Sequence, residues 1–239
     1  MPGGASGCLS FPFVQLPERL TRRRLLGLAA LGLGGLRPLG WDPPRAEAGL
    51  GAVSSGAVTC VLAPELTEGP YYLPNEAVRR DITEGKPGTP LRLHVTVVGT
   101  SSCKPLKSAA VDIWHADASG VYSGVAGNSG TFLRGVQKTD RNGLAVFDTI
   151  YPGWYQGRAV HIHVKVHVGG NVVHTGQLFF PDALTDQVYK AAPYRARGNP
   201  DVADAADSIY RNGGSRSLLH PVKSGSGYLA SMVMGVHTG

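Results

Sequence analysis

Residues 160–168 read Val-His-Ile-His-Val-Lys-Val-His-Val, a strict alternation of apolar and polar side chains. Because successive side chains of an extended strand point to opposite faces, this period of two predicts a β-strand with one apolar and one polar face. The apolar face consists of Val and Ile, whose branched side chains favour strands. We therefore expect Val160, Ile162 and Val164 to enter the core and His161 and His163 to share the opposite face.

Similar segments recur along the rest of the chain. Strand-forming stretches lie at residues 91–97, 111–113, 135–139, 144–147, 172–180 and 228–236. Asn142-Gly143 predicts a tight hairpin between residues 135–139 and 144–147, since this dipeptide accepts the positive φ values of such a turn. Gly169-Gly170-Asn171 predicts the turn from residues 164–168 into the strand at 172–180.

Helix signals are weak and come late in the chain, near residues 185–190 and 201–210. Between the strands lie Gly, Pro and Asn in positions that favour turns. Short strands at regular spacing with such punctuation are typical of a β-sandwich. We therefore predict an all-β fold with short peripheral helices.

The N-terminus reads as an export signal. Three arginines at positions 22–24 precede an apolar run over residues 25–36, and Ala46-Glu47-Ala48 offers a cleavage site of the A-x-A type. The run is too short to span a membrane comfortably. The arginines also resemble the twin-arginine signal, whose pathway carries folded proteins. An ordinary secretory signal and an uncleaved anchor remain as alternatives.

This organisation predicts a signal at residues 1–48, a linker at 49–57 and one domain over 58–239. The domain is expected to work in the periplasm or outside the cell, with no stable membrane insertion after the signal is removed. Residues 1–48 contain six Arg and three Asp/Glu, and this positive excess accounts for half of the net charge of +6. The remaining excess is modest and contains no Lys/Arg run, so the sequence does not indicate nucleic-acid binding.

Cys60 and Cys103 are the cysteines left once the signal, which holds Cys8, is excluded. A cysteine pair in an exported chain predicts a disulfide. It would close a loop of roughly 40 residues and contribute up to about 4 kcal/mol in the chain-entropy model. Two buried free thiols are the alternative.

The histidine pair is the first candidate for chemistry. Two residues on one strand face are separated by roughly 6.6 Å, so two imidazoles can converge on one metal ion. Histidines that are hydrogen-bonded or face solvent are the alternative. The sequence has no His or Cys pairs at the standard zinc spacings, whereas Tyr155 precedes His161 by six residues. A phenolate is a ligand that a hard trivalent cation stabilises, although a single Tyr is more often a packing residue.

Three segments carry a family resemblance. They are Thr67-Glu68-Gly69-Pro70-Tyr71-Tyr72, then Val111-Asp112-Ile113-Trp114 through Gly120-Val121-Tyr122, and Tyr151-Pro152-Gly153-Trp154-Tyr155 running into Arg158 and His161-Ile162-His163. With them the chain resembles the intradiol ring-cleaving dioxygenases over about residues 58–236. The resemblance implies an immunoglobulin-like β-sandwich and, as cofactor, one Fe(3+). The implied iron ligands are Tyr122, Tyr155, His161 and His163.

The resemblance also implies substrates, a small aromatic diol of the catechol type and O2. The ring would be cleaved between its two hydroxylated carbons to give a muconate-type diacid, as in aromatic hydrocarbon catabolism. Tyr155 would leave the iron and act as base, and Arg158 would stabilise charge on the substrate ring. Gln177 would lie next to the iron ligands without binding the iron itself. Tyr71 and the loop at residues 123–130 are the candidate pocket walls.

Two other functions compete with this one. The histidine pair would serve equally in a non-catalytic exported β-sandwich module that binds copper or zinc, or in a zinc hydrolase, and neither needs both tyrosines. The catechol-specific members of the family dimerise through an N-terminal helical segment, and no helical pattern precedes Val58. That mode of dimerisation is therefore not expected, although a homo-oligomer is possible. In this respect the chain resembles the exported, single-domain branch of the family.

Overall fold

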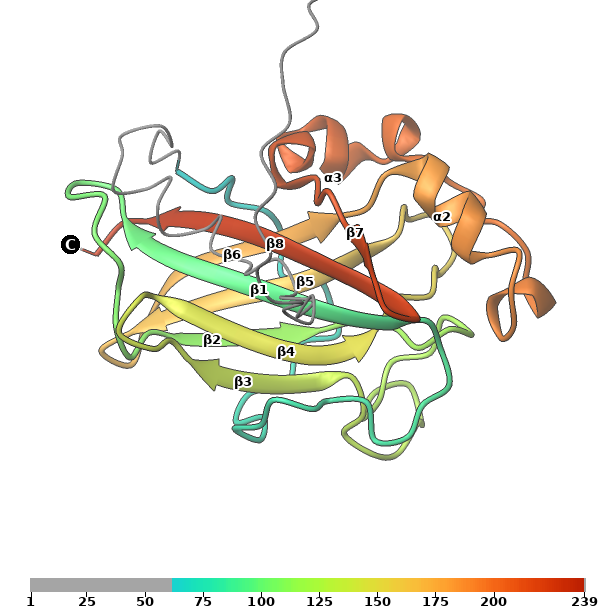
Figure 1. Ribbon diagram of the computed structural model, residues 1–239, viewed down its shortest axis with the longest axis horizontal. Helices are drawn as coiled ribbons and strands as arrows, with labels where there is room; N and C mark the ends of the chain where they lie inside the picture. The colour runs from blue at the N-terminus through green and yellow to red at the C-terminus, as the bar shows by residue number, and fades with distance from the viewer. Residues whose placement is uncertain (1–61, 239) are drawn as a thin grey trace, which may run out of the picture. The chain divides into compact units, whose positions relative to one another are not determined.

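The computed structural model describes residues 62–238 (Figure 1). The predicted signal at 1–48 and the linker at 49–57 lie outside the described residues, as do Cys8 and Cys60. Cys103 is disulfide-bonded, so its pairing with Cys60 in particular stays a prediction. In the described part of the chain, none of the helices has the length and apolarity that a membrane span requires.

Two four-stranded sheets form the body of the domain (Figure 1). The first sheet consists, in spatial order, of β4 (Leu144–Ile150), β1 (Pro90–Gly99), β8 (Gly227–Val236) and β7 (Val222–Ser224). The second consists of β3 (Arg134–Lys138), β2 (Ala110–Trp114), β5 (His161–Val168) and β6 (Asn171–Phe179). All neighbours are antiparallel except β1 and β8, which run parallel.

The core lies between the two sheets. Alternate residues of β1 and β5, such as Leu93, Val95, Ile162 and Val164, are fully buried in one hydrophobic cluster that joins both layers. Burying each such side chain contributes about 1.5–3 kcal/mol. The all-β prediction and the inward direction of Val160, Ile162 and Val164 are therefore confirmed, because the period-two pattern selects which face is buried.

The two predicted hairpins have different outcomes. The turn at Gly169-Gly170 does join β5 to β6 as antiparallel partners. The other prediction is wrong, because β3 pairs with β2 and β4 pairs with β1. The turn at residues 140–143 forms, with Gly143 N–H donating to the Asp140 carbonyl at 3.0 Å, but it carries the chain from one sheet to the other. The residues of the turn therefore predicted that the chain turns here, but not which strands pair with β3 and β4.

Short helices follow the strands late in the chain, as predicted. Residues 185–190 correspond to α2 (Asp182–Val188), and residues 201–210 correspond to the 3-10 turn η2 (Asp204–Ala206) and α3 (Ser208–Arg211). Two further 3-10 turns, η1 (Tyr194–Ala196) and η3 (Gly214–Ser217), and the short strand β7 have no counterpart in the sequence-based prediction.

An irregular segment, residues 64–79, covers the outer face of the second sheet. The Leu66 N–H donates to the Thr175 carbonyl of β6, and the Val136 N–H of β3 donates to the Ala77 carbonyl. Over the centre of the sheet, Gly69 approaches so closely that a Cβ at this position would lie 3.3 Å from His163 Cε1. The polar face of β5 is therefore buried as well, which the alternation by itself did not predict.

A buried carboxyl near α3 gives a prediction about stability and pH. Burial, together with the charges of Asp182 and Asp207, raises the pKa of Asp204 from 3.8 to about 7. The folded protein therefore binds a proton that the unfolded chain releases, and stability falls as the pH rises from about 4 to about 7. We expect Asp204→Asn to raise the free energy of unfolding at pH 8 by roughly 1–3 kcal/mol.

Chemical denaturation of the variant and the parent at several pH values would measure this effect. The difference between them should vanish near pH 4, grow up to pH 7 and then level off. The exposed Asp186 of α2 offers the control, Asp186→Asn, for which no such growth is expected. A difference that does not depend on pH would contradict the prediction.

Candidate active site

His161 and His163 converge on the outer face of the second sheet. Their Nε2 atoms lie 3.1 Å apart, and both rings are buried. His161 Nδ1 lies 2.7 Å from the Ala159 carbonyl oxygen, which can only accept, so Nδ1 carries the proton and Nε2 has a free lone pair. Burial lowers the pKa of His161 to about 3 and that of His163 well below its ordinary value. Both imidazoles are therefore neutral, the form that binds metals.

The two predicted tyrosines reach the same place from different segments. The Tyr155 hydroxyl lies 3.2 Å from His161 Nε2, and the ring of Tyr122 lies 5.5 Å from that of Tyr155 and 6.1 Å from that of His163. Gly153 makes this possible, because a Cβ there would lie 1.9 Å from the Asp117 carbonyl oxygen. The strand-to-loop passage before Tyr122 and the segment before Tyr155 therefore cross in close contact.

Three buried polar atoms in this cluster have no hydrogen-bond partner: the Tyr122 hydroxyl, His163 Nδ1 and the indole Nε1 of Trp114, which packs against Tyr122. Burial raises the pKa of Tyr122 well above its ordinary value, and burial also raises that of Tyr155 against the opposing effect of Arg158. An unsatisfied buried polar group costs about 1–3 kcal/mol. A cation beside the two Nε2 atoms and the phenols would stabilise the lone pairs and the phenolates together.

The donor set therefore fits a hard trivalent cation. Among residues 62–238, no group of three or more His, Cys, Asp and Glu side chains is placed to hold a metal. The histidine pair is instead accompanied by tyrosines, whose hard oxygen donors suit ferric iron better than zinc or cuprous copper. The residues that could hold such an ion are Tyr122, Tyr155, His161 and His163.

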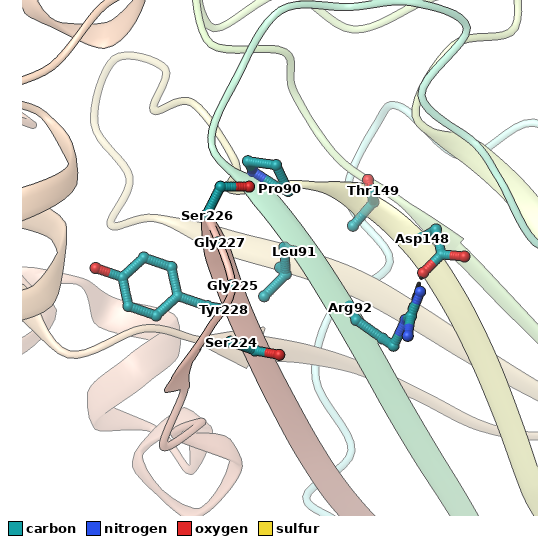
Figure 2. Close-up of a pocket in the computed structure, with 10 residues that line it drawn as sticks. All are labelled: Pro90, Leu91, Arg92, Asp148, Thr149, Ser224, Gly225, Ser226, Gly227 and Tyr228. Carbon is teal, nitrogen blue, oxygen red and sulfur yellow. Dashed lines mark hydrogen bonds and ion pairs between the residues drawn. The ribbon is translucent and has the colours of Figure 1, made fainter. Parts of the chain in front are cut away.

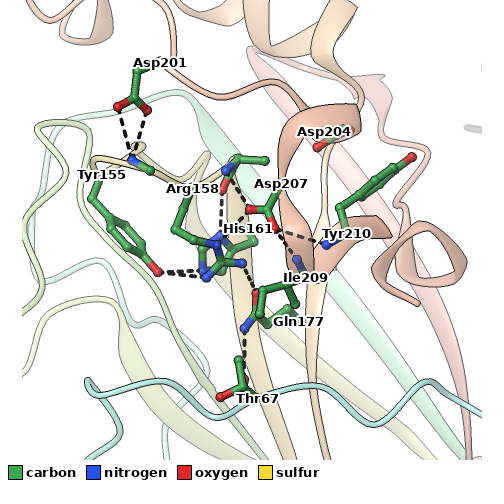
Figure 3. A network of polar contacts seen from close by, with 12 residues as sticks. Thr67, Tyr155, Arg158, His161, Gln177, Asp201, Asp204, Asp207, Ile209 and Tyr210 are labelled. Atoms are coloured by element: carbon green, nitrogen blue, oxygen red, sulfur yellow. Dashed lines mark hydrogen bonds and ion pairs between the residues drawn. The ribbon is translucent and has the colours of Figure 1, made fainter. Parts of the chain in front are cut away.

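Arg158 links this cluster to a polar network (Figure 3). Its Nη1 donates to the Tyr155 oxygen at 3.2 Å, its Nη2 donates to Gln177 Oε1, and its Nε donates to Asp207 Oδ2 at 2.8 Å. Gln177 in turn donates to the Thr67 carbonyl at 2.9 Å. The structure thus places Arg158 and Gln177 in one network with Tyr155, whose hydroxyl lies next to His161.

Tyr71, the predicted pocket wall, lies against the tyrosine pair. Its ring stacks on that of Tyr122 at 4.6 Å and meets that of Tyr155 edge-on at 5.8 Å. Of the predicted loop at residues 123–130, Ser123 is buried and Val125 packs against the cluster around Tyr122, while the rest is mostly exposed. This loop therefore contributes only its first residues to the site.

Three further residues of the site were not predicted. Trp114 stacks on His163 with ring centroids 4.8 Å apart and planes 5° apart. The buried Arg134 donates to the carbonyls of Tyr71 and Ser123, at 2.7 Å and 2.8 Å through its two Nη atoms. Asp207 holds Arg158. Trp114 lies in a segment that the sequence had singled out, whereas nothing in the local pattern distinguishes Arg134 or Asp207 from surface charges.

A separate cleft of about 280 Å³ lies on the first sheet (Figure 2). It is lined by the start of β1, the end of β4 and the β7–β8 turn, and Arg92 pairs there with Asp148 at 2.7 Å. None of the predicted site residues lines it. The chemistry-bearing side chains therefore gather on the second sheet and not in this cleft.

Comparisons with known proteins show the family to which the chain belongs. The family model described as Dioxygenase matches residues 67–209, more than half of the chain. An intradiol ring-cleavage dioxygenase from Tetranychus urticae is 31% identical with a TM-score of 0.71, over 74% of this chain and 95% of that one. The dioxygenase domain of a carbohydrate-binding fusion protein from Streptomyces sp. SirexAA-E is 30% identical with a TM-score of 0.59, over 75% and 100% of the two chains.

Among curated proteins, catechol 1,2-dioxygenase 1 of Acinetobacter lwoffii is 35% identical over 100 residues, 38% of this chain. That match spans 32% of the length of the curated relative. A two-sheet fold with paired histidines and tyrosines on one outer face, together with these matches, defines a ring-cleaving dioxygenase. The chain belongs to the intradiol ring-cleavage dioxygenases.

Proposed function

We propose that this chain is an exported, non-haem Fe(III) intradiol dioxygenase that cleaves catechol-type rings between the two hydroxylated carbons. The product would be a muconate-type diacid, whose two carboxyl groups together contain both atoms of O2. The observation that carries the proposal is that the two Nε2 atoms, 3.1 Å apart, lie beside the partly buried Tyr155 hydroxyl and the ring of the buried Tyr122. We also infer that the sandwich is of the immunoglobulin-like type.

Each side chain has a definite part in this reaction. Bound ferric iron would supply Lewis acidity and an electron sink for the reaction of the ring with O2. His161 and His163 offer neutral imidazoles, because burial keeps them unprotonated. Tyr122, which is buried, would be the permanent oxygen ligand of the metal.

Tyr155 would be the second oxygen ligand of the metal and the base that takes a proton from the substrate. Arg158 Nη1 donates a hydrogen bond to the Tyr155 oxygen, which stabilises the phenolate form of Tyr155. This phenolate oxygen would accept the proton of a substrate hydroxyl. The guanidinium then stabilises negative charge that develops on the substrate ring. Tyr71 and Val125 supply apolar walls that exclude water.

Colour tests the iron assignment. A ferric phenolate has a charge-transfer band in the visible, so the iron-loaded protein should be burgundy and should take up O2 with catechol. We expect Tyr122→Phe to bleach or shift the band and abolish O2 uptake, because it removes one phenolate oxygen. The conservative control is Tyr228→Phe, a tyrosine of β8 in the separate cleft. An unchanged spectrum and full turnover in Tyr122→Phe would remove this tyrosine from the ligand set.

The same spectrum and O2-uptake assay distinguish the proposed function from the alternative one. A copper or zinc module without catalysis would use the histidine pair and leave the tyrosines as packing residues. A colourless protein fully loaded with zinc or copper, and without O2 uptake across a panel of catechols, would favour that alternative. The panel would also identify which diol the site prefers.

Export is supported by the arginines at positions 22–24 and by the disulfide at Cys103, since disulfides persist in oxidising compartments. We expect the full chain to reach the periplasm of a bacterial host in a processed form. Replacing Arg22 and Arg23 together by lysine should leave it in the cytoplasm at full length. Processing and export that continue unchanged in this variant would argue against the twin-arginine route.

A further inference from the structure

Asp207 is a fully buried carboxylate that joins two distant parts of the chain. Its Oδ2 accepts from Arg158 Nε at 2.8 Å and from the Ala159 N–H at 2.9 Å. Its Oδ1 accepts from the N–H groups of Ile209 and Tyr210, at 2.7 Å and 3.1 Å, and so caps α3. Four donors therefore fix the plane of this carboxylate (Figure 3).

A fixed carboxylate in turn fixes the guanidinium of Arg158. The five N–H groups of a guanidinium lie in one rigid plane. Asp207 holds the Nε edge and Gln177 holds Nη2, so the plane of the group is determined before the third contact is made. Nη1 is then directed at the Tyr155 oxygen, 3.2 Å away.

We propose that Asp207 is a positioning residue that orients Arg158 toward Tyr155 and the substrate, and so ties α3 to the active site. The carboxylate does not touch the reacting atoms, and its effect passes through the guanidinium. Without it, an arginine side chain has four rotatable bonds and several water-exposed orientations, so the productive one would be populated less often. This inference rests on the proposed function for its kinetic consequences but not for its geometry.

The test compares two carboxylates of the same neighbourhood. Asp207→Asn removes the charge and keeps an oxygen for the helix cap, since Asn is also a favoured capping residue. The control is Asp201→Asn, because Asp201 accepts from the Gly157 N–H of the same turn and does not contact Arg158 (Figure 3). We expect Asp207→Asn to lower kcat about 10–100-fold with little change in KM, as is typical for partners of functional side chains.

A double-mutant cycle distinguishes positioning from a merely structural role. In an Arg158→Ala background, Asp207→Asn should have no further effect on kcat, because the group that it orients is absent. A further loss of the same size in that background would overturn the proposal. So would an unchanged kcat in the single variant. The iron-phenolate band should be retained in both.

A second readout does not depend on turnover. In ¹⁵N spectra of the iron-free or gallium-loaded protein, the Arg158 Nε–H signal should be protected from exchange in the parent and in Asp201→Asn, and should lose that protection in Asp207→Asn. If the parent protein cleaved no catechol, the proposed function would be wrong. The exchange measurement would still show whether Asp207 orients Arg158. If Asp207→Asn did not fold, Asp207→Ser keeps a capping oxygen and allows the same measurements.

Discussion

Replacing His161 by alanine is expected to remove both the visible band and the O2 uptake of the protein. The imidazole supplies the Nε2 lone pair that faces His163 and Tyr155. The loss of a metal ligand should exceed the 10–100-fold effect on metal affinity that is usual for outer partners. Metal analysis after dialysis, together with O2 uptake with catechol, would measure both consequences in one preparation.

His167→Ala is the matched control for this prediction. His167 lies on the same strand with the same parity, but it is only half-buried and is not part of the site. It should keep the colour, the iron and the rate. The fold should survive His161→Ala because the core side of β5, with Ile162 and Val164, is untouched. Iron and turnover that persist in His161→Ala would refute its role as a ligand.

Replacing Arg158 by alanine should have a different signature. The iron ligands remain, so the band should be retained, perturbed only by the loss of the hydrogen bond to the Tyr155 oxygen. kcat should fall about 100–1000-fold, the usual cost of removing one donor that stabilises developing charge. Stopped-flow spectroscopy under anaerobic conditions would show whether catechol still binds to the iron at normal affinity.

The exposed Arg195 of η1 provides the control, Arg195→Ala, which should leave kcat and KM unchanged. Loss of iron from Arg158→Ala would mean that the arginine maintains the structure of the site and not the charge on the substrate. Asp207 also loses its main cationic partner in this variant. Thermal unfolding should therefore be measured alongside, to separate lower stability from slower chemistry.

The sequence predicted those features of the site that depend on neighbouring residues and missed those that depend on distant ones. The shared face of His161 and His163 is a property of adjacent residues, and alternation within one strand determines it. The hairpin at residues 140–143 is the counterexample. Its turn is local and formed as predicted, but the choice of partners depends on β1 and β2, which come earlier in the chain.

Motifs placed Tyr122 and Tyr155 among the candidates, yet spacing could not bring them to the histidines. Their meeting depends on the close crossing at Gly153, while the segment at residues 64–79 covers the sheet face that carries the histidines. Those contacts join parts of the chain that no periodicity relates. Burial then shifts the pKa values of the site, so its electrostatics also belong to the tertiary structure.

The sequence by itself predicted the all-β class, the inward face of residues 160–164 and, through the family resemblance, the four candidate ligands. These follow from side-chain alternation and from motifs, which need no knowledge of distant residues. Only the tertiary structure decided which strands pair, that the histidine face is covered, and that Asp207 lies 2.8 Å from Arg158 Nε. The physical reason is that 49 residues separate these two side chains along the chain, and only the tertiary fold brings the residue that caps α3 to the turn before β5.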